Sequence, residues 1–278
     1  MQHAEGEFSG EGSIKLYRQA WLPANEAQAV LLVVHGLAEH SGRYRAFGEH
    51  FAGRGYAVHA FDQRGHGKSG GGRCYVSHFS DYVNDLRVFH QLVSAAHPGK
   101  RVFLVGHSVG GTIATAYAAA HPEGLTGLVL SGATLKVGAS ITPGQVKMAR
   151  LVSALLPHLG IAPIEAKGVS RDPAVVAAYE NDPLVCRGKI PARTGAEILR
   201  TMESELPRVV PRITLPVLVM YGTADVLSNP QGSDDFYRLV GSTDKTLKRY
   251  EGFYHEIFNE PERLQVFADV ERWLAARA

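Results

Sequence analysis

The residue with the clearest chemical potential is Ser108, at the centre of Gly106-His107-Ser108-Val109-Gly110. This pentapeptide follows the β-rich run 102–105 and precedes an Ala-rich stretch with a helical pattern. Its two glycines leave room for a sharp turn that exposes the serine oxygen, while the helix N-terminus directs backbone N–H groups toward developing negative charge. The pattern predicts a nucleophile elbow, and the alternative is an ordinary N-cap serine.

A serine hydroxyl is a weak nucleophile, so it needs a base to take its proton and a third group to orient that base. Asp225 comes just after one β-rich run and His255 after the next, and catalytic groups gather at the carboxyl ends of parallel strands. Any one of the thirteen histidines is more often structural, but three strand-end positions in the order Ser, Asp, His predict a triad. The rival acids Asp234 and Asp235 fall inside a predicted helix, where a solvated face explains them.

Another strand end offers backbone hydrogen-bond donors. The run 30–34 ends in His35-Gly36-Leu37, and Gly36 allows the chain to turn so that the Leu37 N–H faces the serine. Together with the N–H of Val109, this donor would hold the oxyanion of a tetrahedral intermediate. We therefore predict Leu37 and Val109 as the oxyanion hole, and a plain turn after a buried strand is the alternative.

The elements that must position these residues alternate along the chain. Most of the β-rich runs are continuously apolar, which is typical of strands covered on both faces in a parallel sheet. Helical patterns separate most of them, and this alternation predicts a doubly wound, mostly parallel central sheet flanked by helices. Together with the nucleophile elbow and the order Ser, Asp, His, it predicts an α/β-hydrolase fold. The expected strands span 30–34, 56–61, 102–105, 125–130, 217–221 and 246–250, the expected helices span 44–53, 79–96, 108–120, 232–240 and 261–276, and an antiparallel edge strand is expected at 15–21.

One interruption divides this alternation, because the stretch from 130 to 216 is too long for an ordinary connection. It contains helical patterns at 146–156, 173–179 and 194–202. We therefore expect a hydrolase core formed by residues 1–135 and 209–278, with residues 136–208 inserted as a helical cap, or lid.

Composition argues against several other classes of protein. The formal net charge is +2 and the basic residues are scattered, so nucleic acid is not an expected partner. Cys74 and Cys186 form no Cys-x-x-Cys pair, and neither a disulfide framework nor a metal or other cofactor is expected. Residues 1–12 are acidic rather than apolar, and no apolar run is long enough to span a membrane. We expect a cytoplasmic protein with, at most, peripheral membrane contact.

Longer motifs resemble those of the monoacylglycerol lipase family. The most specific is His35-Gly36-Leu37-Ala38-Glu39-His40-Ser41-Gly42-Arg43-Tyr44. The resemblance covers nearly the whole chain, including the predicted cap, through further segments at 65–69, 106–111, 170–173, 179–184 and 250–256.

This resemblance implies cleavage of a monoacylglycerol by the triad and oxyanion donors predicted above. It also implies a narrow polar exit for glycerol, formed by Glu39, Arg43 and Tyr179. A glyceryl head group needs hydroxyl partners at one end of an otherwise apolar tunnel. Alternatively, Glu39 and Arg43 form an i,i+4 ion pair at a helix start. The chain departs from the family pattern at Phe258, where some members have a second histidine in the glycerol pocket, and at Ser228, where some have a cysteine.

The predicted cap also bears on the substrate. Residues 146–156 carry more apolar surface than a two-layer cap must bury, together with Lys147 and Arg150. They predict a lip that docks on a membrane interface or lines the acyl tunnel, and the alternative is a helix packed wholly onto the core.

Other functions stay open at this point. A lysophospholipase, a short-chain carboxylesterase and an aryl esterase would use the same triad and cap. A non-catalytic hydrolase-fold binding protein is the rival from another class, but such proteins generally lose a triad member or block the pocket.

Overall fold

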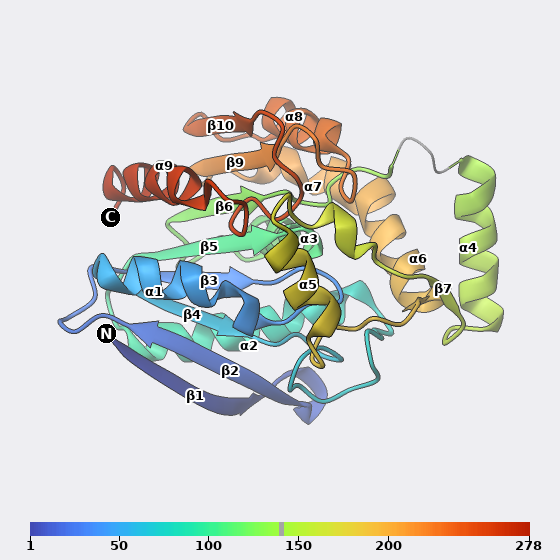
Figure 1. Cartoon of the computed structure of the whole chain (residues 1–278), viewed down its shortest axis with the longest axis horizontal. Helices are drawn as coiled ribbons and strands as arrows, with labels where there is room; N and C mark the ends of the chain where they lie inside the picture. The colour runs from blue at the N-terminus through green and yellow to red at the C-terminus, as the bar shows by residue number, and fades with distance from the viewer. Residues whose placement is uncertain (139–141) are drawn as a thin grey trace.

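The computed structural model describes residues 1–138 and 142–278. Over these residues the chain forms an eight-stranded sheet with the order β1-β2-β4-β3-β5-β6-β9-β10 (Figure 1). Strands β4 to β10 in that order are parallel, whereas β1 and β2 pair antiparallel. This is the predicted α/β-hydrolase sheet. Its strands span Gln2–Ser9 (β1), Lys15–Leu22 (β2), Ala29–Val34 (β3), Tyr56–Phe61 (β4), Val102–His107 (β5), Gly127–Ser131 (β6), Val217–Gly222 (β9) and Lys245–Tyr250 (β10).

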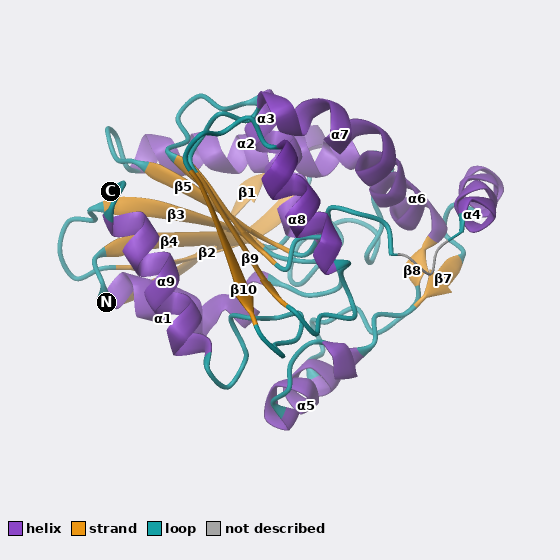
Figure 2. Ribbon diagram, turned by 90° about the horizontal axis from the view of Figure 1, so that it is seen from above, coloured by secondary structure: helices purple, strands orange, loops and turns teal. Residues whose placement is uncertain are grey.

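The side chains of the strands alternate between two cores, one on each face of the sheet. In β3, Val30, Leu32 and Val34 pack into one core, and Leu31 and Val33 pack into the other, as the two-residue period of a strand requires. Burial on both faces explains why the strands read as continuous apolar runs. The first face is covered by α2 (Phe79–Ala96), α3 (Val109–Ala120) and α8 (Pro230–Leu239), and the second by α1 (Arg45–Gly53) and α9 (Arg263–Ala275) (Figure 2).

The antiparallel strand predicted at residues 15–21 is present as β2, but the prediction that it forms the edge of the sheet is wrong. β1 pairs along its whole length with the outer side of β2. In β1, Phe8 is buried while most other side chains are exposed, and they include the acidic Glu5 and Glu7. Hydrophobic patterning therefore gives no strand signal here, because backbone pairing with β2 holds the segment in place.

The segment between β6 and β9 leaves the sheet and forms mostly helices. Helix α4 begins at Pro143 rather than at residue 146, because the Thr142 side chain caps it by accepting the backbone N–H of Gln145. It stands off at one end of the molecule, where it packs against α6 (Figure 1). The segment comprises α4 (Pro143–Leu155), the small antiparallel pair β7 (Gly160–Ala162) and β8 (Ile190–Pro191), α5 (Pro173–Asn181), α6 (Ala192–Arg200), a π-helical turn (Thr201–Glu205) and α7 (Leu206–Val209).

Short 3-10 turns complete the structure, at Glu11–Ser13, Ser41–Tyr44, Ala166–Gly168 and Val210–Arg212. None of the helices in residues 1–138 and 142–278 is long and apolar enough to cross a membrane. The same residues contain no cluster of His, Cys, Asp and Glu side chains suited to a metal ion.

Candidate active site

Ser108 sits at the sharp junction between β5 and α3. Its φ of 53° and ψ of −126° are unusual for a residue with a side chain and match a strained elbow. The flanking glycines are required by space, because a Cβ at Gly110 would lie 2.2 Å from the carbonyl oxygen of Val34, and one at Gly106 would lie 2.7 Å from that of Gly110. The predicted strand, turn and helix around the serine are therefore all present.

Asp225 and His255 meet in the interior after β9 and β10. His255 Nδ1 lies 2.7 Å from Asp225 Oδ2, and both side chains are buried. The other carboxylate oxygen of Asp225 accepts the backbone N–H groups of Leu227 and Ser228 at 2.8 and 2.9 Å. Burial alone would lower the pKa of His255, but the charge and hydrogen bond of Asp225 raise it above its ordinary value. Asp225 therefore orients the imidazole and stabilises its protonated form.

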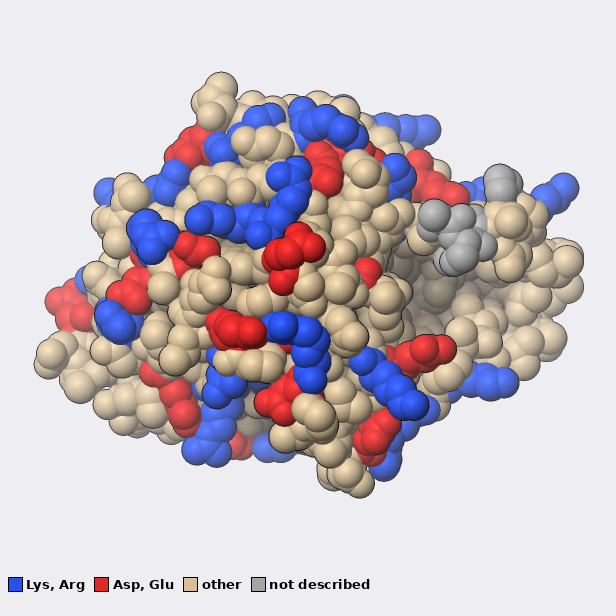
Figure 3. Space-filling view, turned by 45° about the horizontal axis from the view of Figure 1, so that its top comes forward, with Lys and Arg blue, Asp and Glu red and all other residues tan. Residues whose placement is uncertain are grey.

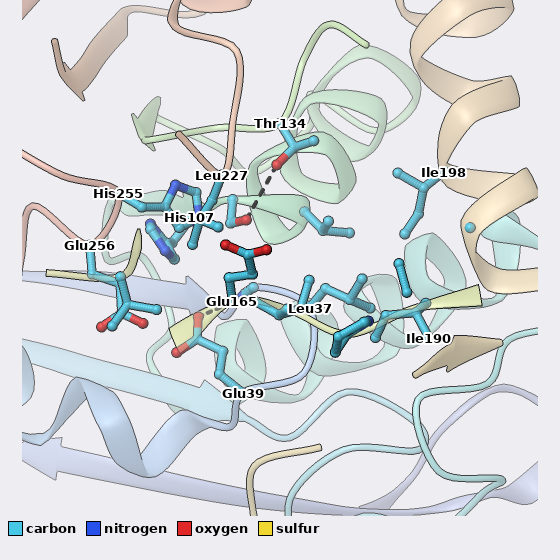
Figure 4. A pocket seen from close by; sticks show the side chains of 18 of the residues that line it. Leu37, Glu39, His107, Thr134, Glu165, Ile190, Ile198, Leu227, His255 and Glu256 are labelled. Atoms are coloured by element: carbon cyan, nitrogen blue, oxygen red, sulfur yellow. Dashed lines mark hydrogen bonds between the residues drawn. The ribbon is translucent and has the colours of Figure 1, made fainter. Parts of the chain in front are cut away.

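Ser108 and His255 line the same cavity, of about 450 Å³. Within the described residues no hydrogen bond joins them, and Ser108 Oγ instead lies 3.3 Å from Thr134 Oγ1 (Figure 4). Thr134 in turn contacts Ser228 Oγ at 2.8 Å. Sequence analysis missed Thr134, which follows β6. Knowing that β6 lies beside β5 would have indicated it.

A second histidine packs against the first. The ring of His107 lies 4.7 Å from that of His255, centroid to centroid, and its Nδ1 lies 2.8 Å from the carbonyl oxygen of Ser131. Burial lowers the pKa of His107 well below its ordinary value, and charge repulsion from His255 lowers it further. His107 is therefore neutral, and of the two rings His255 is the one suited to exchange a proton near neutral pH.

The turn after β3, which was predicted to supply an oxyanion donor, lies against Ser108. Among the described residues, the backbone N–H groups of Leu37 and Val109 find no acceptor, so both are free to bind a ligand oxygen. Gly36 donates its N–H to Glu39 Oε1 at 2.5 Å, and that oxygen also accepts the Tyr44 hydroxyl at 2.8 Å. Glu39 therefore fixes the turn that carries the first predicted donor.

The predicted polar residues form one buried cluster. Arg43 lies 3.4 Å from Glu39 Oε2 and 2.5 Å from Glu256 Oε2, and its guanidinium stacks on the Tyr179 ring at 4.8 Å. The i,i+4 ion pair considered from the sequence is thus present, and sequence analysis missed Glu256. Burial and the Glu256 charge raise the pKa of Glu39 to about 7. Within the described residues, the buried Tyr179 hydroxyl has no hydrogen-bond partner.

The two departures from the family pattern have clear surroundings. Phe258 is buried and packs against Phe47, with ring centroids 4.9 Å apart, so it belongs to the apolar core beneath the polar cluster. Ser228 takes part in the Asp225 and Thr134 contacts described above. Ser228 therefore supports the acid of the site through its backbone.

The sheet, the elbow and the buried acid–histidine pair define an α/β-hydrolase. A model of the family described as serine aminopeptidase S33 matches residues 25–262. The chain is 37% identical to a monoacylglycerol lipase of Mycolicibacterium smegmatis, over 98% of this chain and 97% of that protein. It is also 37% identical to the human monoglyceride lipase, over 99% of this chain and 89% of that protein.

A solved structure leads to the same family. The crystal structure of the Paleococcus ferrophilus monoacylglycerol lipase matches with a TM-score of 0.85 at 32% identity, over 95% of this chain and 99% of that one. The chain belongs to the monoacylglycerol lipase family, as its motifs predicted.

Proposed function

We propose that this protein hydrolyses monoacylglycerols to fatty acid and glycerol through an acyl-enzyme on Ser108. The observation that carries the proposal is the buried Asp225–His255 pair, in which His255 lines the same cavity as Ser108. A cavity of about 450 Å³ with mostly apolar walls suits a fatty acyl chain, and the names of the relatives agree with this substrate.

The proposed reaction has two halves. His255 takes the proton of Ser108 as its oxygen attacks the ester carbonyl, and the N–H groups of Leu37 and Val109 bind the oxyanion. His255 then gives the proton to the departing glycerol oxygen. Water repeats the cycle on the acyl-enzyme, while Asp225 stabilises the imidazolium at each proton transfer. No residue of this scheme needs a metal or another cofactor.

We propose that the polar cluster reads the glycerol head group. The unpartnered hydroxyl of Tyr179 is the strongest support, because a buried donor without a partner is costly and a substrate hydroxyl would satisfy it. Glu39 and Arg43 contribute less directly, because each already has protein partners.

We further propose that residues 136–208 act as a cap and that α4 contacts lipid surfaces. Met148, Leu151 and Leu155 on α4 are exposed, which supports lipid contact over the alternative that this helix packs wholly onto the core. Figure 3 shows the projecting end of the molecule as mostly uncharged, beside a hollow that separates it from the body. A cytoplasmic location with peripheral membrane contact is part of this proposal.

The test is kcat/KM for monoacylglycerols of increasing chain length, beside methyl esters and lysophosphatidylcholine of the same chains. We expect monoacylglycerols to be preferred, and loss of all activity in Ser108→Ala but not in Ser242→Ala, which alters a buried serine outside the cavity lining. Equal rates for methyl esters would indicate a general carboxylesterase. A fluorophosphonate probe that fails to label the folded protein would indicate a binding protein instead.

A further inference from the structure

The charged side chains that line the active-site cavity are all acidic among the described residues. Three carboxylates line it, those of Glu39, Glu165 and Glu256. Within the described residues, the lining includes no Lys or Arg. The nearby Arg43 is already shared between Glu39 and Glu256, so it does not offset a third negative charge. The cavity therefore has an excess of negative charge next to the nucleophile.

Glu165 is the carboxylate that has no counter-charge. It lies just before the 3-10 turn Ala166–Gly168, between β7 and α5, and its side chain is exposed. Figure 4 shows it projecting into the pocket, between the side that holds His255 and the side that holds Leu37. Among the described residues, its carboxylate has neither a hydrogen bond nor an ion pair. An ionised group in this position is not neutralised by the protein and acts on whatever enters the cavity.

The other residues that line the cavity strengthen the repulsion between Glu165 and an anionic ligand. They are largely aliphatic, with Ile164, Ile190 and Ile198 among them, and low-polarity walls screen a charge less than bulk water does. An anionic ester would lose hydration on entry, find no Lys or Arg side chain among the described lining residues and face the Glu165 charge. An uncharged ester of the same size would suffer only the displacement of water.

We propose that Glu165 is a specificity residue that excludes anionic esters from Ser108. The proposal rests on the proposed ester hydrolysis and narrows its substrate class to uncharged acyl esters. It also predicts easier product release, because hydrolysis turns an uncharged ester into a carboxylate close to the same negative charge. Anionic lysophospholipids are thereby rejected, although the apolar part of the cavity would accept their acyl chains.

The test compares two soluble substrates, 1-octanoylglycerol and 1-octanoylglycerol 3-phosphate, in the full-length protein and in Glu165→Gln. The variant keeps the shape of the side chain and removes its charge. We expect the ratio of kcat/KM for the phosphate ester to kcat/KM for octanoylglycerol to rise about fivefold or more. Inhibition by octanoate should strengthen in the variant by a similar factor.

Lys167 provides a matched control, because it lies on the same turn but outside the cavity lining. Lys167→Gln changes the net charge by one unit, and we expect it to leave the ratio of the kcat/KM values for the two substrates unchanged. Raising ionic strength should reduce the discrimination of the wild type but not that of Glu165→Gln. If Glu165→Gln changes both substrates equally, or neither, the proposal is wrong.

A pair of aryl esters separates this proposal from the proposed function. If octanoylglycerol is not cleaved but 4-nitrophenyl butyrate is, the monoacylglycerol assignment fails. The proposed exclusion of anionic esters by Glu165 is then tested with mono-4-nitrophenyl glutarate, for which kcat/KM should rise in Glu165→Gln. If octanoylglycerol is cleaved and neither anionic substrate responds to the variant, only the role of Glu165 is refuted.

Discussion

Replacing Gly36 by alanine should disable the oxyanion turn while the fold survives. A Cβ at this position would lie 2.9 Å from Ser108 Cβ and 2.9 Å from Glu39 Oε1. Gly36 is not among the described residues with positive φ, so the substitution tests space rather than backbone strain. Carbon atoms settle roughly 3.5–4.0 Å apart, so the turn and the nucleophile must separate by about 1 Å.

The magnitude follows from that displacement. Removing one oxyanion donor costs about 10²–10³ in kcat, and a misplacement of about 1 Å can cost about 10². We therefore expect kcat to fall about 10²-fold in Gly36→Ala. The crowding should destabilise the fold by about 1–3 kcal/mol, or a few degrees in Tm for a chain of this size.

The assay is the steady-state hydrolysis of 4-nitrophenyl butyrate, with Tm measured on the same samples. Gly53→Ala at the end of α1 is the control, because a Cβ there meets no other atom within 4 Å. We expect it to keep full activity and to match or exceed the wild-type Tm. If Gly36→Ala keeps a third or more of wild-type kcat, the turn does not act as the oxyanion hole in this arrangement.

Three further predictions concern the acid, the polar cluster and the lip. Asp225→Asn should lower kcat about 10³–10⁴-fold and shift the acid limb of the pH–rate profile to lower pH, because the carboxylate that raises the pKa of His255 is lost; an unchanged acid limb would contradict this role. Folding raises the pKa of Glu39 to about 7, so the Glu39 carboxyl holds its proton more tightly in the folded protein than in the unfolded chain. The free energy of unfolding should therefore fall as pH rises from about 4.5 to 7. Urea unfolding should show that the free energy of unfolding of the wild type declines by up to about 3 kcal/mol over this pH range, and that the decline is absent in Glu39→Gln. The same dependence on pH in both proteins would refute this prediction. Leu155→Asp, at a side chain 71% exposed on α4, should weaken vesicle co-sedimentation without slowing hydrolysis of a soluble ester, whereas Leu239→Asp on α8 should do neither.

Strand-end residues were predictable because the relevant signals are local. Ser108, Asp225 and His255 each follow an apolar β-rich run, and parallel strands bring their carboxyl ends to one edge of the sheet. The nearby glycines at the elbow indicate the turn that exposes the serine. The family motifs extended this interpretation to the polar cluster, whose head-group role stays a prediction, as do the boundaries of the cap.

The sequence by itself therefore determined the class of fold and predicted a candidate nucleophile and the order of a candidate triad, because burial patterns and turn residues act over a few positions. Only the tertiary structure decided which distant side chains meet. Arg43 binds Glu256, 213 positions away, and Thr134 reaches Ser108 because β6 lies beside β5. The proposed role of Glu165 also depends on the tertiary structure, because its segment folds over the cavity and leaves its carboxylate without a partner among the described residues. Such contacts depend on strand order and packing, which no local pattern encodes.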